Sequence, residues 1–222
     1  LCRLGLITIN QTKTLDMKLI AFSLTAVVLA FSSVSAFSAS PAPAPAAKPD
    51  LVKGEASYTA VCAACHNADG NASIAINPKL SQLQEFKSGK RKDPVMQGMV
   101  ASLSDADMRN ISYWLATKPA KLGFAKDKDA AAIGERIYRG GIPDRQIAAC
   151  AGCHSPNGVG IPAQYPRLSG QNADYVAKTL HDFRDGKRLN RGKMTQVTAK
   201  MNDKEIKAVA DEAAAERLIL SL

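Results

Sequence analysis

The sequence predicts an all-α protein of two tandem domains, and three observations lead to this prediction. No stretch of the chain sustains the alternation of apolar and polar residues that a half-buried strand requires. Helix-start signals occur, such as Ser104 followed by Asp105 and Asp107 ahead of an apolar run. The two halves of the chain also align on each other, which indicates a duplicated domain.

The expected helices can be placed in chain order, and they cover residues 54–64, 104–117, 133–139, 173–183 and 202–220. In the fourth helix, Val176, Ala177 and Leu180 fall on one face, as packing against a core requires. The fifth helix lacks an aromatic residue, whereas the corresponding helix of the first half carries Tyr113 and Trp114. We therefore expect the end of the chain to differ from its counterpart.

The repeat is clearest around two short cysteine motifs. Residues 62–81 align without a gap with residues 150–169, at a spacing of 88 residues. Beyond this block the first half lacks nine residues that correspond to 170–178 in the second half. The counterpart of the helix expected at 173–183 should therefore be much shorter in the first half. A group bound by the first half would then be covered by fewer residues.

The first 53 residues precede the repeat and carry export signals. Residues 1–16 lie before a natural start at Met17, and we interpret them as non-native upstream sequence. Residues 17–36 contain a lysine, an apolar run and small residues, as a secretory signal peptide does. An uncleaved anchor is the alternative, although the run is short for a membrane span of about 20 residues.

A Pro/Ala-rich leader follows at 37–53, where proline at alternate positions favours extended chain and blocks helix. The two domains are then expected at 54–120 and 133–222, with a linker at 121–132 between them.

The chain is basic, with a formal net charge of +9 over 222 residues. This balance favours an acidic partner or an anionic surface. Nucleic acid is the alternative partner of a basic chain. The Lys and Arg residues are scattered through both repeats without a nucleic-acid-binding motif, so we expect no nucleic acid partner.

Two Cys-x-x-Cys-His motifs carry the candidate chemistry. Two thiols at this spacing can add to the two vinyl groups of a porphyrin, and the adjacent histidine can bind the iron. The candidate attachment residues are Cys62, Cys65, Cys150 and Cys153, and the candidate iron ligands beside them are His66 and His154.

Two other interpretations of these cysteines compete with haem attachment. A zinc site takes its four ligands from two nearby pairs, but these pairs lie 88 residues apart. Disulfides are expected for bare thiols outside the cytoplasm, but they leave both adjacent histidines unexplained.

Met96 aligns with Met194, and these two methionines are the expected distal ligands of the iron. A thioether favours ferrous iron, so histidine–methionine ligation raises the reduction potential. The alternative is a core methionine, with water or histidine on the iron. Met108 and Met201 fall near expected helices and are interpreted as core residues.

Pro78 and Pro166 each follow the motif histidine by twelve residues. A histidine that binds a metal usually donates its other ring N–H to a carboxylate or carbonyl, so these prolines are candidate acceptors. A plain turn proline is the alternative. His181 is the remaining histidine, and we expect it at the surface or against a haem propionate.

From residue 54 to about 210 the sequence resembles the dihaem cytochromes c of the c4 family. Besides both motifs, the resemblance rests on Asp69-Gly70-Asn71, Phe86-Lys87-Ser88-Gly89, Met96-Gln97-Gly98-Met99, Tyr138-Arg139-Gly140-Gly141 and Tyr165-Pro166-Arg167-Leu168-Ser169-Gly170-Gln171. It implies two tandem class I cytochrome c domains related by an approximate two-fold, each with one covalently bound haem c and a histidine–methionine pair on its iron.

The resemblance also implies a function. The protein would be a periplasmic electron carrier and not an enzyme, passing single electrons between respiratory-chain donors and a terminal oxidase. A membrane donor complex would then be its other redox partner, and peripheral membrane association is left open.

The first alternative is the cytochrome subunit of a flavin-containing sulfide dehydrogenase, although the chain holds no flavin or nucleotide motif. The second is a haem peroxidase, which needs Met96 or Met194 to leave the iron. In any of these roles the lysines could steer an acidic partner, and the candidates are Lys87, Lys90, Lys92, Lys187 and Lys193.

Overall fold

The computed structural model describes residues 47–74, 77–78, 82–121, 127–161 and 164–215, and it places the chain from Ala47 onward in one compact unit. The expected upstream segment and signal peptide, and the leader up to residue 46, lie outside the described residues. Among the described residues, none of the helices has the length and apolarity of a membrane span. We call residues 47–121 the first half and residues 127–215 the second half.

Helices make up the regular structure of the described residues, which form no β-sheet; isolated β-bridges join Ile142 to Ile147 and Ile161 to Tyr165. The first half contains α2 (Leu51–Val61), α3 (Ala63–His66), α4 (Leu83–Lys87), α5 (Pro94–Val100) and α6 (Asp105–Ala116). The second half contains α7 (Lys128–Gly140), the 3-10 turn η1 (Pro143–Arg145), α8 (Ala151–His154), α9 (Ala173–Arg184), α10 (Gly192–Thr198) and α11 (Asp203–Ala214). The all-α prediction is confirmed.

The helix starts follow from capping side chains. Ser104 and Asp107 form a reciprocal capping box that begins α6, as the sequence predicts. Asp127 accepts hydrogen bonds from the next helix and begins α7 five residues earlier than expected, inside the segment interpreted as linker. Asp50 likewise begins α2 at Leu51, three residues before the expected start.

The last helix is shorter than the sequence predicts. Asn202 caps α11 in a second capping box. The helix ends at Ala214 because Ala215 is extended, with ψ near 155°. The expectation of a helix to residue 220 is therefore wrong at Ala215, and its remaining part lies outside the described residues.

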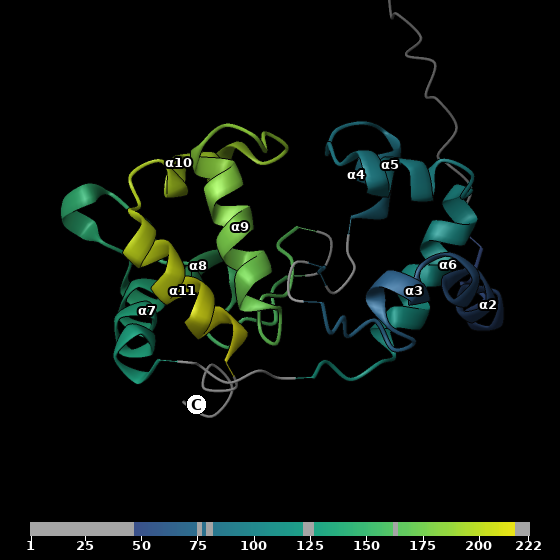
Figure 1. Ribbon diagram of the computed structural model, residues 1–222, viewed down its shortest axis with the longest axis horizontal. Coiled ribbons are helices and arrows are strands. Elements are labelled where there is room, and N and C mark those ends of the chain that lie inside the picture. The colour runs from purple at the N-terminus through teal and green to yellow at the C-terminus, as the bar shows by residue number, and fades with distance from the viewer. Residues whose placement is uncertain (1–46, 75–76, 79–81, 122–126, 162–163, 216–222) are drawn as a thin grey trace, which may run out of the picture. The chain divides into compact units, whose positions relative to one another are not determined.

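The deletion in the first half appears in the structure as a lost length of helix. Helix α9 has 12 residues, whereas the corresponding α4 has 5. Figure 1 shows the long α9 beside α11 and the short α4 beside α5. The prediction of a shortened helix is confirmed.

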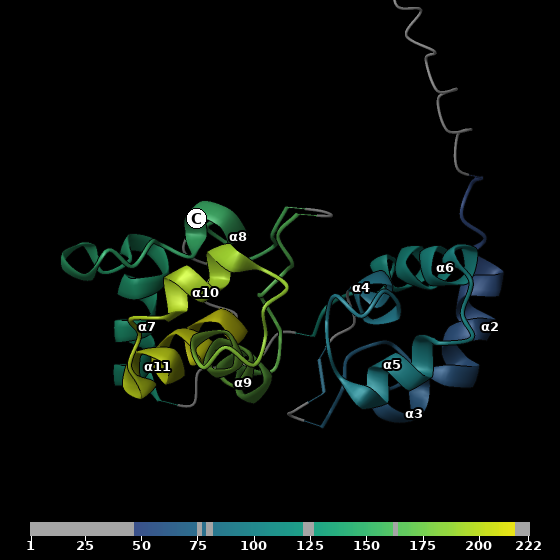
Figure 2. The same ribbon diagram turned by 90° about the horizontal axis from the view of Figure 1, so that it is seen from above.

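In each half the first helix crosses the last one at a glycine (Figures 1 and 2). A Cβ atom added to Gly54 on α2 would lie 2.4 Å from the carbonyl oxygen of Asn110 on α6. A Cβ atom added to Gly134 on α7 would lie 2.1 Å from the carbonyl oxygen of Ala208 on α11. Each crossing therefore brings two helix backbones into contact, which a side chain at the glycine would prevent.

The two crossings differ in the residue beside the glycine. In the first half this residue is Trp114, whose ring centroid lies 4.8 Å from that of Tyr58. In the second half the same place is taken by Glu212, which is fully buried. The missing aromatic of the last helix is therefore replaced by a carboxyl side chain inside the core.

Substitution of Gly134 tests whether the backbones of α7 and α11 are in contact at their crossing. Gly134→Ala should lower the free energy of unfolding of the second half by about 3 kcal/mol, because the methyl group meets backbone that cannot move aside. Chemical denaturation of the haem-loaded protein measures this loss. Gly140→Ala on the same helix is the control: its Cβ meets nothing within 4 Å, so stability should stay the same or rise by up to about 1 kcal/mol. Equal effects of the two substitutions would contradict the close crossing.

Candidate haem-binding sites

Each cysteine motif forms a single helical turn that ends sharply after its histidine. The residues that follow, Asn67 and Ser155, have φ values of 61° and 70°, in the left-handed region. A buried tyrosine of the preceding helix fixes each turn. Tyr58 donates its hydroxyl to the carbonyl of Asn67 at 2.5 Å, and Tyr138 donates to the carbonyl of Ser155 at 2.8 Å. Each tyrosine lies four residues after the glycine of its helix crossing, Gly54 or Gly134. Sequence reasoning gave neither tyrosine this role, although Tyr138 is part of the family resemblance.

Both motif histidines are held by the predicted proline carbonyls. The Nδ1 atom of His66 lies 2.8 Å from the carbonyl oxygen of Pro78, and that of His154 lies 2.8 Å from the carbonyl oxygen of Pro166. A carbonyl oxygen can only accept, so Nδ1 carries the hydrogen and the Nε2 lone pair is left for a metal. The interpretation of these prolines as acceptors is confirmed.

The protonation of the histidines suits metal binding as well. Burial lowers the pKa of both His66 and His154, while the proline carbonyl opposes this shift. Because burial is the larger influence, the neutral imidazole is favoured, and only the neutral ring can give its lone pair to iron.

The environment of Cys62 and Cys150 favours uncharged sulfur. Burial, followed by the influence of Cys65, raises the pKa of the Cys62 thiol to about 11. Burial raises the pKa of the Cys150 thiol to about 11 as well. None of the four motif cysteines is joined in a disulfide. A thioether carries no charge, so these sites fit sulfur bonded to a porphyrin better than thiolate bonded to zinc.

A cavity of about 680 Å³ is lined mainly by the second half, with Pro78, Gln82, Lys90 and Arg91 of the first half also in its wall. Its volume falls within the range of roughly 300–1,000 Å³ that ligand sites occupy. Cys150, Cys153, His154 and Met194 all line it, so the structure brings the four predicted residues of this half together. Much of its wall is apolar, formed by Val176, Leu180, Phe183, Val197 and Val209 among others. The residues present therefore fit a porphyrin that is held through sulfur on one side of a mainly apolar space.

The first half places two of its four predicted residues, Cys62 and Met96, in one apolar cluster. Cys62 is buried in this cluster, and Met96 packs against it. Met99, on the same helix α5 as Met96, is 38% exposed. Met96, which aligns with Met194 in the repeat, is therefore the methionine of α5 that lies beside the cysteine motif.

The other two methionines lie in the cores. Met108 is 2% exposed and Met201 is 4% exposed, which confirms their interpretation as core residues. Met201 also lines the cavity of the second half. It aligns with Leu103 in the repeat, so a ligand at this position would have no counterpart in the first half.

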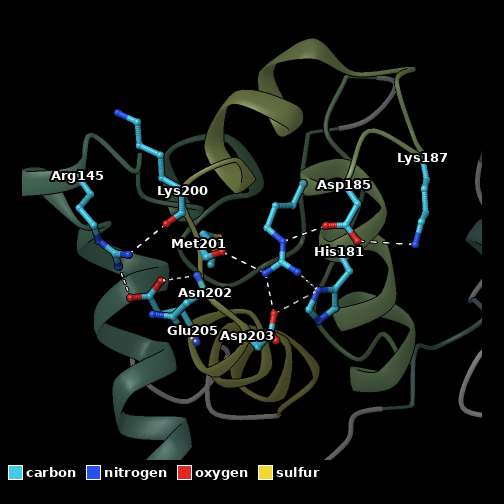
Figure 3. A network of polar contacts seen from close by, with 10 residues as sticks. Arg145, His181, Asp185, Lys187, Lys200, Met201, Asn202, Asp203 and Glu205 are labelled. Atoms are coloured by element: carbon cyan, nitrogen blue, oxygen red, sulfur yellow. Dashed lines mark hydrogen bonds and ion pairs between the residues drawn. The ribbon is translucent and has the colours of Figure 1, made fainter.

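His181 takes part in a surface network and is not among the residues that line the cavity. Figure 3 shows its ring beside Asp203, with Nδ1 3.7 Å from the Asp203 carboxylate. Arg184 lies 3.0 Å from the same ring nitrogen and also pairs with Asp203 at 2.7 Å. The side chain of His181 is 34% exposed, as the surface interpretation expects.

Comparison with known proteins defines the class first. The cytochrome c family matches residues 131–211, and a family described as subunit III of cbb3-type cytochrome c oxidase matches residues 49–115. The chain therefore consists of two c-type cytochrome domains.

Individual relatives narrow the class to a family. Cytochrome c4 of Pseudomonas aeruginosa is 42% identical over 174 residues, which are 72% of this chain and 86% of the relative. The crystal structure of reduced recombinant cytochrome c4 from Pseudomonas stutzeri superposes with a TM-score of 0.71 at 38% identity, covering 76% of this chain and 99% of that one. A thiosulfate dehydrogenase electron acceptor of Thiomonas intermedia is 35% identical over 206 residues, which are 86% of this chain and 91% of the relative.

This chain belongs to the cytochrome c4 family. It is a dihaem electron-transfer protein with two covalently bound haem c groups, one for each Cys-x-x-Cys-His motif.

Removal of one tyrosine hydroxyl tests how the motif turn is held. Tyr138→Phe should lower the free energy of unfolding by about 1–2 kcal/mol, because the carbonyl of Ser155 loses its donor. Chemical denaturation measures the change. Tyr113→Phe is the matched control, because Tyr113 is 55% exposed. Loss of its hydroxyl should change the free energy of unfolding by less than about 0.5 kcal/mol. A Tyr138→Phe variant as stable as the control would show that the hydroxyl does not support the turn.

Proposed function

We propose that this chain is an exported electron carrier whose two irons are each held by a histidine and a methionine. His66 and Met96 would hold one iron, and His154 and Met194 would hold the other. One observation carries the proposal: Cys150, Cys153, His154 and Met194 line a single cavity, and the histidine is fixed through its Nδ1 atom. When bound, haem c supplies reversible one-electron exchange at its iron.

The residues of the chain would do three things around this group. The cysteines would bind it covalently, and the carbonyls of Pro78 and Pro166 would keep each imidazole in one tautomer and orientation. The thioethers of Met96 and Met194 would occupy the position opposite each histidine and leave no coordination site for a substrate. Such a closed site favours electron transfer over catalysis.

The location and the partners follow from the same proposal. Residues 17–36 would direct export to the periplasm, residues 37–53 would form a leader, and the two cytochrome domains would follow. There the protein would carry electrons from a membrane donor complex to a terminal oxidase. The matches to two cytochrome domains and the basic charge of the chain support this role.

Substitution of the methionines tests the axial ligands. Met96→Leu and Met194→Leu should each remove about half of the weak red absorption band that the family resemblance implies for methionine on ferric iron. Each should also lower the reduction potential of one haem, because the ligand that favours ferrous iron is gone. Absorption spectra and potentiometric titration of the purified protein measure both effects.

Met99→Leu is the matched control, since Met99 lies on the same helix but is 38% exposed. It should change neither the band nor the potentials. If Met194→Leu kept the full band and Met201→Leu lost about half of it, the ligand of the second iron would be Met201, which would contradict the proposal.

A second candidate function is favoured by the relatives named as thiosulfate dehydrogenase electron acceptors, which are 35% identical to this chain. In this role the electron donor would be a sulfur-oxidising dehydrogenase instead of a membrane complex. The cytochrome subunit of a flavin-containing sulfide dehydrogenase, the alternative considered from the sequence, would also receive electrons from sulfur oxidation.

Direct electron transfer separates these roles. If the chain serves a respiratory oxidase, its reduced form should be reoxidised by membranes that contain a terminal oxidase, at a rate that falls as ionic strength screens its basic surface. Reduction by purified thiosulfate dehydrogenase with thiosulfate would instead support the second role. Stopped-flow absorption measures both reactions, and failure of both would contradict the carrier function in either form.

A further inference from the structure

The cavity of the second half has a strongly cationic lining. Among the described residues that form its wall there are six Lys or Arg residues and no Asp or Glu, the six being Lys90, Arg91, Arg167, Arg188, Arg191 and Lys193. Lys90, Arg167 and Lys193 are exposed, but Arg91, Arg188 and Arg191 are partly buried, and partly buried charges of one sign are costly unless anions join them. This lining therefore indicates an anionic occupant, in addition to the apolar one that the rest of the wall suits.

Two of these cations come from different halves of the chain and share one acceptor. Arg91 Nη1 donates to Gln82 Oε1 at 3.2 Å, and Arg188 Nη2 donates to the same oxygen at 2.9 Å. Arg91 of the first half also donates to the hydroxyl of Tyr175 in the second half. Both guanidinium groups thus meet in one place at the cavity, with uncharged acceptors.

Aromatic rings fix the position of both groups. The Cζ atom of Arg91 lies 4.4 Å from the ring centroid of Phe86, and that of Arg188 lies 4.6 Å from the ring centroid of Phe183. The two pairs occupy matching places in the repeat. The arginines are therefore held ready in the structure, and a ligand need not order them on binding.

The nearby acid is already engaged. Glu85 pairs with Arg191 and accepts a hydrogen bond from Asn190 at 2.6 Å. Burial, followed by the charge of Arg91, lowers the pKa of Arg188 to about 10. The charge of Glu85 opposes this shift, but the hydrogen bonds from the Arg91 and Arg188 side chains to Gln82 and Tyr175 all end on uncharged oxygens.

We propose that Arg91 of the first half, together with Arg188, binds the carboxylate groups of the haem attached at Cys150 and Cys153. The first half thereby completes the site of the second haem and contributes to its reduction potential. The inference rests on one part of the proposed function, namely that this haem occupies the cavity. A guanidinium fork is suited to two-point contact with a carboxylate.

The test is the reduction potential of each haem in an Arg91→Gln variant of the full haem-loaded chain. Loss of the positive charge favours the oxidised, more positive iron, so the potential of the second haem should fall and its reduction constant should decrease roughly fivefold. The first haem should change less. Potentiometric titration followed by proton NMR separates the two haems, with the Met96→Leu and Met194→Leu variants assigning the signals.

Lys92→Gln is the matched control, because it removes the same charge from the adjacent, exposed residue, which is not part of the cavity wall. It should leave both potentials nearly unchanged. Arg91→Lys keeps the positive charge but loses the two-point contact of the guanidinium group. The reduction potential of its second haem should lie between those of the wild type and Arg91→Gln.

Three other results would contradict the inference or the function on which it rests. A shift confined to the first haem would show that Arg91 serves only its own half and would overturn the inference. Potentials equal to those of Lys92→Gln would overturn it too. Absence of haem from Cys150 and Cys153 in the wild-type protein, measured by mass spectrometry, would instead refute the proposed function and leave no second haem for Arg91 to bind.

Discussion

The hydrogen bond from the motif histidine to a proline carbonyl is the interaction on which each half of this protein depends. It joins residues twelve positions apart in both halves, at the same distance of 2.8 Å. The chain turns sharply after the histidine in both halves, where Asn67 and Ser155 adopt positive φ. The bond fixes which ring nitrogen carries the hydrogen, and so it decides which nitrogen can face the iron.

The two halves support this common feature with different packing. The first half keeps an aromatic pair, Trp114 with Tyr58, at its helix crossing but has only a short helix α4. The second half has the full helix α9 but buries Glu212 where the aromatic would stand. Duplicated domains of one chain can thus preserve a chemical site while the elements around it diverge, because the site needs only the motif, the proline loop and an apolar wall.

The second half also makes contacts that bear on the shortened part of the first. Asn172, the residue that precedes α9, donates its side-chain amide to the carbonyls of Ala72, Ile74 and Asn77 at 2.9–3.3 Å. Arg188 and Asn190 reach Gln82 and Glu85 at the start of α4. Residues just before and just after α9 thus contact the loop that precedes α4 and the start of α4 itself. The two cytochrome domains are in this sense not independent of each other.

The sequence by itself determined the chemistry of each half, because covalent attachment and histidine ligation depend on spacings of a few residues that the chain fixes locally. It also determined the repeat, the shortened helix α4 and the capping of α6, which follow from local pattern and alignment. Only the tertiary structure decided that α11 stops at Ala214 and that Glu212 is buried at the crossing with α7. It alone brought Arg91 to the cavity of the other half. Glu212 meets Gly134 from 78 positions away, and Arg91 meets Tyr175 from 84 positions away. Such contacts depend on how whole helices pack, which no local pattern in the chain encodes.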